Sequence, residues 1–172
     1  MVTKFIEVND LVNNFSLEVL TGADFLKDYI KEDNARRPGL EFIKYLSFFP
    51  QNRVYVLGEH EIQYLYTLPE LEREERIENL VKYQPPCIIV TDGIDGLKYL
   101  PKYCAKRNIP LLRTEEPHYE FIKKVDSYLI RQLAPEIAVH GVCLNVFGIG
   151  VLLRGASGIG KSETAHSLIG RG

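Results

Sequence analysis

The feature that most constrains this 172-residue chain is a glycine-rich segment near its C-terminal end. The segment reads GASGIGKS and matches the pattern GxxxxGK[ST] in full. Its residues are Gly155, Ala156, Ser157, Gly158, Ile159, Gly160, Lys161 and Ser162. An apolar, strand-like run precedes it and a helical stretch, Lys161–Ile169, follows it. A phosphate-binding loop requires this order, which disfavours the other reading, a glycine-rich turn with an incidental lysine.

The chemistry of phosphate binding explains the residue types in this loop. Phosphate oxygens are bound by several backbone N–H groups that point into one concavity, and glycines reach the positive φ angles that such a loop needs. Lys161 can bring a positive charge to the β- and γ-phosphates, and the Ser162 hydroxyl is placed to ligate Mg²⁺. The helix that begins at Lys161 directs its positive dipole end at the same phosphates.

Charged residues and glycines are unevenly distributed along the chain. Only five of the 44 charged residues lie between positions 133 and 172, whereas eight of the 13 glycines lie from Gly141 onward. No proline follows Pro135. We therefore predict a domain boundary near residues 131–137, with one domain over residues 1–133 and an incomplete phosphate-loop domain over residues 134–172.

Composition argues against several classes of protein. A net charge of −2 is too low for a protein that binds nucleic acid through its phosphate backbone. No apolar run approaches the roughly 18 residues of a membrane span, and the N-terminus lacks the apolar stretch of a signal peptide. Three cysteines without a CxxC pair are typical of a reducing cytoplasm. We therefore expect a cytoplasmic protein with neither a membrane nor a nucleic acid as partner.

Upstream of the boundary, strand-like and helix-like segments alternate. Apolar residues at helical spacing predict helices over residues 8–15, 39–49, 70–83, 96–108 and 118–133. Short apolar runs predict strands over residues 17–20, 53–57, 87–91 and 109–113. The run CIIVT at 87–91 is typical of a strand covered on both faces. The alternation predicts an α/β domain with a small, open, mostly parallel sheet and flanking helices.

Downstream of the boundary, residues 138–147 and 150–153 are apolar and rich in β-forming residues. We predict two strands joined as a hairpin by a turn at residues 148–150, with the second strand running directly into Gly155. His140 lies in the first strand. A lone histidine in a strand is more often a core or edge residue than a functional one, and no spacing relates His140 to Lys161.

Three further features have weaker interpretations. Arg36 and Arg37, which precede Pro38, are either exposed arginines at the start of a helix or a binding site for an anionic metabolite. The charged run ELEREERIE at 70–78 is typical of a solvated helix face, with a partner surface as the alternative. Cys143, in a β segment, is expected to be buried and inert.

Several segments together resemble the HPr kinase/phosphorylase family. The resemblance is carried by HGV at 140–142, VFGIGVLL at 146–153 and GASGIGKSET at 155–164. Two upstream segments agree, RPGLE at 37–41 and PPCIIVT at 85–91. Ordinary phosphate-loop proteins do not share the HG and VFGIGVLL segments, so the resemblance is specific, and it spans most of the chain.

The resemblance implies a bifunctional enzyme with a phosphate-loop kinase domain similar to phosphoenolpyruvate carboxykinase. Members of the family use ATP and Mg²⁺ to phosphorylate a serine of HPr, the phosphocarrier protein of the sugar phosphotransferase system. They also remove that phosphate by phosphorolysis, with inorganic phosphate as reactant and pyrophosphate as product. This activity controls carbon catabolite repression, and the family assembles as hexamers through its kinase domains.

The resemblance also implies roles for particular residues. Active-site positions of the family fall on His140 and Lys161, the nucleotide loop falls on residues 155–162, and Ser162 falls on a magnesium ligand. A pair of catalytic aspartates follows the loop helix in the family, in a segment that would come after Gly172. We therefore expect this sequence to be the front part of a longer enzyme.

The sequence departs from the family pattern at three positions. Ala156 replaces a frequent acidic residue, Asn145 a common aspartate and His166 a usual leucine. None of them is Lys161 or Ser162, so nucleotide binding remains the expectation. Two other functions stay open: a regulatory or oligomerisation module without catalysis, and a different phosphate-loop kinase. The absence of ATP binding would favour the module. The absence of an aspartate pair from the parent gene would favour a different phosphate-loop kinase.

Overall fold

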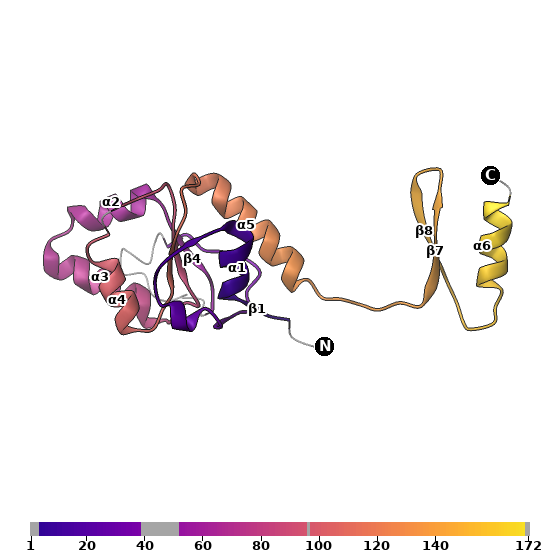
Figure 1. The fold of residues 1–172 in the computed structure, drawn as a ribbon, viewed down its shortest axis with the longest axis horizontal. Coiled ribbons are helices and arrows are strands. Elements are labelled where there is room, and N and C mark those ends of the chain that lie inside the picture. The colour runs from indigo at the N-terminus through magenta and orange to yellow at the C-terminus, as the bar shows by residue number, and fades with distance from the viewer. Residues whose placement is uncertain (1–3, 39–51, 96, 171–172) are drawn as a thin grey trace. The chain divides into compact units, whose positions relative to one another are not determined.

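The computed structural model describes residues 4–38, 52–95 and 97–170. The chain divides into two compact units, unit 1 (Met1–Ala134) and unit 2 (Pro135–Gly172). Its elements, drawn in Figure 1, are β1 (Ile6–Glu7), α1 (Val8–Phe15), β2 (Glu18–Thr21), a 3₁₀ turn (Ala23–Phe25), β3 (Tyr29–Ile30), β4 (Tyr55–Leu57), α2 (Glu59–Thr67), α3 (Glu70–Lys82), β5 (Ile88–Val90), α4 (Leu100–Lys106), β6 (Leu111–Arg113), α5 (His118–Leu133), β7 (Gly141–Val146), β8 (Ile149–Arg154) and α6 (Lys161–Ile169). Within the described ranges, no helix is both long and apolar enough to cross a membrane.

Unit 1 is built on a four-stranded sheet with the order β2-β6-β5-β4. The strands β4, β5 and β6 are parallel, and their register places Val56 beside Ile89 and Ile89 beside Leu112. The edge strand β2 runs antiparallel to β6. A separate antiparallel pair joins β1 to β3. The prediction of a mixed α/β fold is confirmed.

Helices cover both faces of this sheet, because successive side chains of a strand point to opposite sides. Tyr55, Leu57 and Ile88 belong to a core that includes residues of α2, α3 and α4. Val56 and Ile89 belong to a second core that includes residues of α1 and α5. Figure 1 shows α2, α3 and α4 on one side of β4 and α1 and α5 on the other. The central strand β5 is buried along its whole length, as the apolar run at 87–91 predicts.

The helices of unit 1 follow their apolar periodicity. In α5, Phe121, Val125 and Leu129 recur every four residues and are fully buried. The predicted bounds 8–15 and 118–133 are confirmed, but the helix predicted over 96–108 spans only Leu100–Lys106. Pro101 lies in its first turn, where proline is tolerated, which explains the later start. The predicted helix over 39–49 lies outside the described residues.

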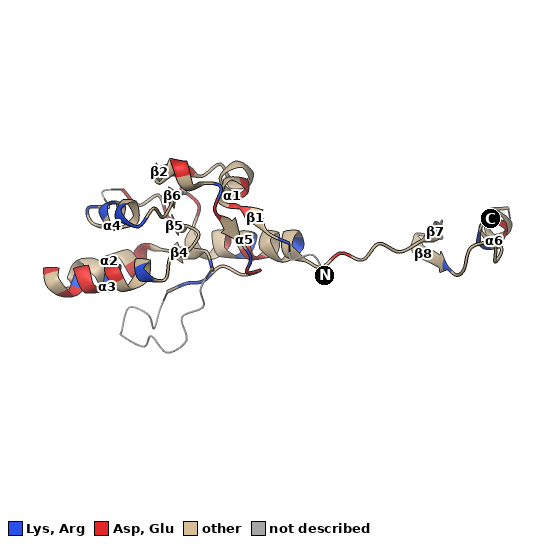
Figure 2. Cartoon of the chain, turned by 90° about the horizontal axis from the view of Figure 1, so that it is seen from below, with Lys and Arg blue, Asp and Glu red and all other residues tan. Residues whose placement is uncertain are grey.

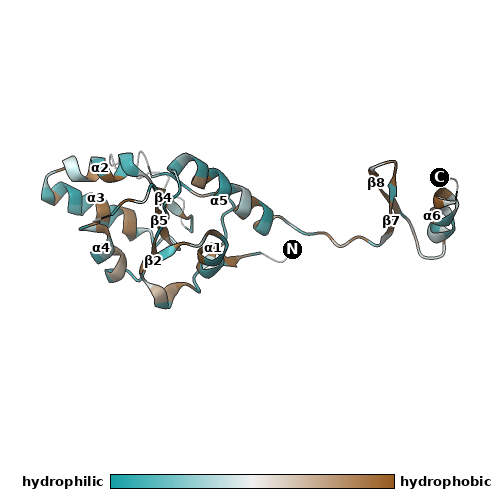
Figure 3. Ribbon diagram, turned by 45° about the horizontal axis from the view of Figure 1, so that its top comes forward, coloured by the Kyte–Doolittle hydropathy of each residue, from teal (hydrophilic) through white to brown (hydrophobic). Residues whose placement is uncertain are grey.

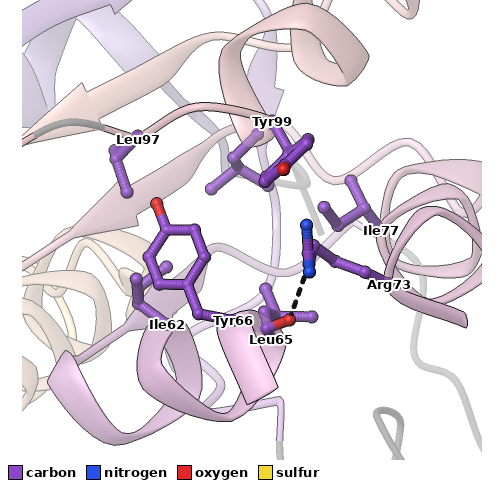
Figure 4. A pocket seen from close by; sticks show the side chains of 8 residues that line it. Ile62, Leu65, Tyr66, Arg73, Ile77, Leu97 and Tyr99 are labelled. Carbon is purple, nitrogen blue, oxygen red and sulfur yellow. Dashed lines mark hydrogen bonds between the residues drawn. The ribbon is translucent and has the colours of Figure 1, made fainter. Parts of the chain in front are cut away.

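The acidic helix α3 is held on the molecule by one side of its surface. Arg73 donates to the carbonyl oxygens of Leu65 and Leu68 at 2.9 and 2.7 Å, and its guanidinium lies 4.5 Å from the centre of the Tyr99 ring. Figure 4 shows Arg73, Leu65 and Tyr99 among the side chains around a cavity. Its volume is about 10 Å³, too small for more than one water molecule. The glutamates at positions 70, 72, 75 and 78 are exposed, and Figure 2 shows the acidic residues along α2 and α3. The prediction of a solvated charged face is confirmed for these glutamates, whereas Arg76 of the same run is buried.

Unit 2 consists of a β-hairpin and one helix. The strands β7 and β8 pair without interruption from Gly141 opposite Arg154 to Val146 opposite Ile149. A two-residue turn, Phe147-Gly148, joins them, which is one residue earlier than the predicted turn. The helix α6 contacts both strands and buries Ala165. Both strands are apolar in Figure 3, yet Cys143 is exposed, so the prediction of a buried thiol was wrong.

Candidate phosphate-binding loop

The glycine-rich loop connects β8 to α6 in unit 2, so the predicted strand, loop and helix are all present. Gly158 and Gly160 have φ angles of 78° and 89°, in the left-handed region that glycine reaches at little cost. Gly160 is the residue that precedes α6, so the chain turns sharply into the helix there. A Cβ atom at Gly155 would lie 3.1 Å from Cγ2 of Ile159, because the loop folds closely over its own start.

Lys161 folds back along this loop. Its Nζ atom donates hydrogen bonds to the carbonyl oxygens of Gly155 and Ala156, at 2.9 and 2.6 Å. The backbone N–H and hydroxyl of Thr164 both donate to the Gly160 carbonyl at 2.9 Å, which closes the first turn of α6. Ser162 is exposed in that turn. A positive charge, a loop with two left-handed glycines and a helix N-terminus fit a triphosphate, and the Ser162 hydroxyl fits a ligand of Mg²⁺.

His140 lies at the end of the hairpin from which the loop starts. Gly141, the first residue of β7, pairs with Arg154, the last residue of β8. His140 precedes that pair and Gly155 follows it, so the register brings the two to the same end of the hairpin. His140 is exposed there. Sequence spacing gives no sign of this relation, because it depends on which residues of the two strands pair.

The three departures from the family pattern have distinct positions. The Asn145 side-chain oxygen accepts a hydrogen bond from Gly148 N at 2.9 Å and so fixes the hairpin turn. This is the role that Asn and Asp commonly share in turns, so the replacement keeps the geometry. Ala156 contributes its carbonyl oxygen to Lys161, a contact that any residue can make. His166 is exposed in α6, and nothing in the structure explains why it replaces leucine.

The paired arginines of the sequence analysis lie in unit 1 and separate in the fold. Arg36 continues the edge of the sheet: its N–H donates to Val54 O, and its carbonyl accepts from Val56 N, at 2.8 and 2.9 Å. The Arg37 side chain extends to helix α2, where its Nε atom lies 2.7 Å from Oε1 of Glu61. Glu61 is buried and also accepts a hydrogen bond from Gly58 N at 2.9 Å. Burial alone would raise the pKa of Glu61, but these two hydrogen bonds outweigh it and lower that pKa.

Fold and loop together define a class of protein, one in which an α/β unit is followed by a strand, a glycine-rich loop of the phosphate-binding pattern and a helix. Comparison with known families makes this specific. The family described as HPr Serine kinase N terminus matches residues 6–129, and the HPr Serine kinase C-terminal domain matches residues 131–172. The chain therefore belongs to the HPr serine kinase family.

Individual relatives agree with this assignment. The chain is 59% identical over 169 residues to "Putative HPr kinase/phosphorylase 2" of Oceanobacillus iheyensis, covering 98% of this chain and 55% of the relative. It is 36% identical to HPr kinase/phosphorylase of Shouchella clausii and 39% identical to that of Clostridium acetobutylicum, in each case over 97% of this chain. These matches cover 54% and 55% of the relatives, so the chain spans about half their length.

Among solved structures, the chain is similar to the CBS and DRTGG domains of the regulatory region of Clostridium perfringens pyrophosphatase. The TM-score is 0.48 at 17% sequence identity, over 75% of this chain and 47% of that one.

Proposed function

We propose that this chain belongs to an enzyme that transfers a phosphoryl group from ATP to a serine of the phosphocarrier protein HPr. The observation that carries the proposal is the loop between β8 and α6, with Lys161 held on the Gly155 and Ala156 carbonyls. The family assignment supports it, because both family descriptions are of HPr serine kinase domains. The relatives bear the name HPr kinase/phosphorylase, which supports the reverse reaction as well.

In this proposal the residues of unit 2 bind and orient the phosphates. Lys161 leaves the loop carbonyls and pairs with the β- and γ-phosphates, while the loop N–H groups bind their oxygens. Ser162 would hold Mg²⁺, which would supply charge neutralisation for the transferred phosphoryl group. His140, at the same end of the hairpin as Gly155, is proposed as an active-site residue beside that group. The residues that orient the attacking serine and complete the magnesium site are proposed to follow α6 in the family's enzymes.

The wider properties of the family are proposed for this protein on the same grounds. They are phosphorolysis by inorganic phosphate with release of pyrophosphate, control of carbon catabolite repression, a cytoplasmic location and assembly as hexamers. The second unit is proposed to have the fold of a phosphoenolpyruvate-carboxykinase-like kinase domain. The order of its hairpin, glycine-rich loop and helix supports this fold.

A phosphotransfer assay tests the proposal directly. The protein made from the complete reading frame is incubated with HPr, Mg²⁺ and labelled ATP, and then with phosphorylated HPr and inorganic phosphate. We expect serine phosphorylation in the first reaction and pyrophosphate in the second. Lys161→Ala should lower both by at least about 100-fold, because it removes a charge that stabilises the transferred group. Lys98→Ala, an exposed lysine of unit 1, is the matched control. Retained activity in Lys161→Ala would refute the assigned role.

A regulatory or oligomerisation module without catalysis is the second candidate. It is favoured by the number of apolar side chains that unit 1 buries. That unit has two cores of its own, whereas unit 2 buries little. Calorimetric titration of the 172-residue chain with ATP and Mg²⁺ separates the two candidates. Binding at micromolar affinity supports a formed nucleotide loop, and the absence of heat at millimolar ATP supports the module.

A further inference from the structure

A hollow of about 370 Å³ lies in unit 1, outside the carboxyl ends of the parallel strands. Gly58 follows β4, Asp92 follows β5 and Pro117 comes after β6, and all three line the hollow. The helix after β4 packs into one core and the helix after β6 packs into the other, so the connections that flank β5 leave toward opposite faces of the sheet. Figure 1 shows α2 and α5 on opposite sides of β4. In open α/β sheets, ligands bind in crevices of this kind.

The walls of the hollow carry several groups that can bind an anion. The Arg37 side chain is 49% exposed, and its Nε atom is fixed by the buried carboxylate of Glu61. The helices α2 and α5 both begin at the hollow, at Glu59 and His118. The first turn of a helix leaves backbone N–H groups without intrahelical acceptors and carries positive partial charge. Arginine presents a planar fork of donors that matches carboxylate and phosphate oxygens.

One internal carboxylate already ties the two helices together. Asp92 Oδ1 accepts a hydrogen bond from His118 N at 2.8 Å, and Oδ2 accepts from Glu59 N at 3.1 Å. Asp92 has a φ angle of 61°, a conformation that costs free energy in a residue other than glycine. Strain of this kind is found most often at sites that must hold a fixed geometry. Asp92 is held by these donors, and Arg37, whose Nε atom pairs with Glu61, is the basic side chain that lines the hollow beside it.

The floor of the hollow is closely fitted around His118. The Nδ1 atom of His118 lies 2.9 Å from the Thr91 hydroxyl, while Nε2 is buried with no hydrogen-bond partner among the residues that the structure describes. A Cβ atom at Gly58 would lie 2.7 Å from the imidazole ring, so only glycine allows this approach. A buried polar atom without a protein partner can have its hydrogen bonding completed by a water molecule or a ligand atom.

We propose that this hollow binds a small metabolite that carries a phosphate or carboxylate group, held by Arg37 and the first turns of α2 and α5. All described lining residues of the hollow belong to unit 1, and the proposal does not depend on the proposed phosphotransfer. The sequence suggests that Arg36 and Arg37 together could bind an anionic metabolite. In this proposal Arg37 alone binds the anion, because the backbone of Arg36 pairs at the sheet edge.

The test uses the 172-residue chain with Lys161→Ala, so that the loop of unit 2 does not compete for phosphate. Amide spectra are recorded during titration with inorganic phosphate and, separately, with citrate. We expect saturable shifts at Gly58, His60 and Tyr119 with one anion or both, and the responding anion identifies the ligand as a phosphate or a carboxylate. No saturable shift with either anion would overturn the proposal.

Variants connect the shifts to Arg37. Arg37→Gln should weaken binding by at least tenfold, and Arg37→Lys, which keeps a positive charge beside Glu61 but loses the planar fork, should weaken it several-fold. Arg131→Gln removes an exposed arginine of α5 and should leave the affinity unchanged. Because Arg37→Gln leaves Glu61 without its ion-pair partner, the double variant Arg37→Gln, Glu61→Gln serves as the check on folding. Equal binding by a folded Arg37 variant and the parent would overturn the proposal.

Discussion

The two units of this protein differ most in the fraction of their apolar side chains that is buried. Within the described ranges, Ala165 is the one buried apolar residue of unit 2, whereas unit 1 buries two clusters around its sheet. Large apolar residues that are exposed in unit 2 are Ile137, Val139, Phe147, Ile149, Leu152, Ile159, Leu168 and Ile169. Unit 1 therefore has a closed apolar core, whereas unit 2 exposes most of its large apolar side chains.

The buried clusters that stabilise the fold therefore lie in unit 1, whereas the loop proposed to bind phosphates lies in unit 2. Stretches shorter than about 40 residues rarely bury enough surface to fold alone, and unit 2 has that size. Its loop owes its form to local features: two left-handed glycines, a hairpin register and the contacts of Lys161. Unit 1 depends instead on contacts between residues far apart in the sequence. Damage to one unit should therefore leave the other largely unchanged.

The largest expected contrast is in thiol reactivity. Cys143 in unit 2 is exposed, while Cys87 and Cys104 in unit 1 are buried, and burial raises the pKa of Cys104 to about 12. A buried thiol reacts only after an opening of the structure, so the two should react roughly 1,000-fold more slowly than Cys143. A thiol-reactive dye should label one cysteine in the native chain and three in denaturant. Rapid labelling of Cys104 would show that the core of unit 1 is not closed.

Matched phenylalanine variants test the contrast in burial. Phe121 is fully buried in α5, and Phe147 is 90% exposed at the hairpin turn. Phe121→Ala should lower the unfolding free energy of unit 1 by about 3–5 kcal/mol, the usual cost of removing a core aromatic ring. Phe147→Ala should change it by less than about 0.5 kcal/mol. Urea unfolding, monitored by circular dichroism, measures the free-energy change of each variant. Similar losses of stability in the two variants would contradict the contrast in burial between the units.

Asp92 tests how the loops of unit 1 are held. Asp92→Ala removes an acceptor shared by the first turns of α2 and α5 and should cost about 1–2 kcal/mol, as for a lost helix cap. Asp92→Asn keeps one side-chain oxygen as an acceptor and should cost less. Thermal unfolding gives the comparison. An alanine variant as stable as the parent would show that the carboxylate does not link the two helices.

Acid should weaken unit 1 gradually. Burial lowers the pKa of His118 from its usual 6.5, so the unfolded chain takes up a proton first and stability falls as the pH drops through that value. Burial opposes ionisation of Asp92, but its hydrogen bonds from His118 N, Glu59 N and Thr91 outweigh this and lower its pKa. Its contribution is therefore present above pH 3.8 and is lost as the pH falls through its lowered pKa. A melting temperature that rises between pH 7 and pH 3 would contradict both assignments.

The sequence predicts local structure well where a single pattern decides it. The helices at 8–15 and 118–133 follow from apolar spacing, and the loop follows from its glycines and Lys161. The helix α2 is absent from the prediction because Glu61, a charged residue, lies on its buried side and interrupts the apolar pattern. The antiparallel direction of β2 depends on pairing with β6, more than 90 residues later, which spacing does not show.

The sites follow the same rule. The residues of the loop are consecutive, so one motif identifies them, while the relation of His140 to Gly155 exists only through strand pairing. The hollow of unit 1 combines Arg37, Gly58, Asp92 and His118, which share no motif. Only Arg37 drew attention in the sequence, as part of a charged pair. A site assembled at the ends of several strands becomes visible once the sheet order is known.

Titration of the ¹⁵N-labelled chain with ATP and Mg²⁺ tests the central claim, that the loop between β8 and α6 binds the phosphates of a nucleotide. The account predicts saturable amide shifts at Gly158, Gly160 and Lys161, no comparable shift at Ile89 in the core of unit 1, and loss of the loop shifts in Lys161→Ala. Absence of shifts in the loop at millimolar ATP, or equal shifts in Lys161→Ala, would contradict it.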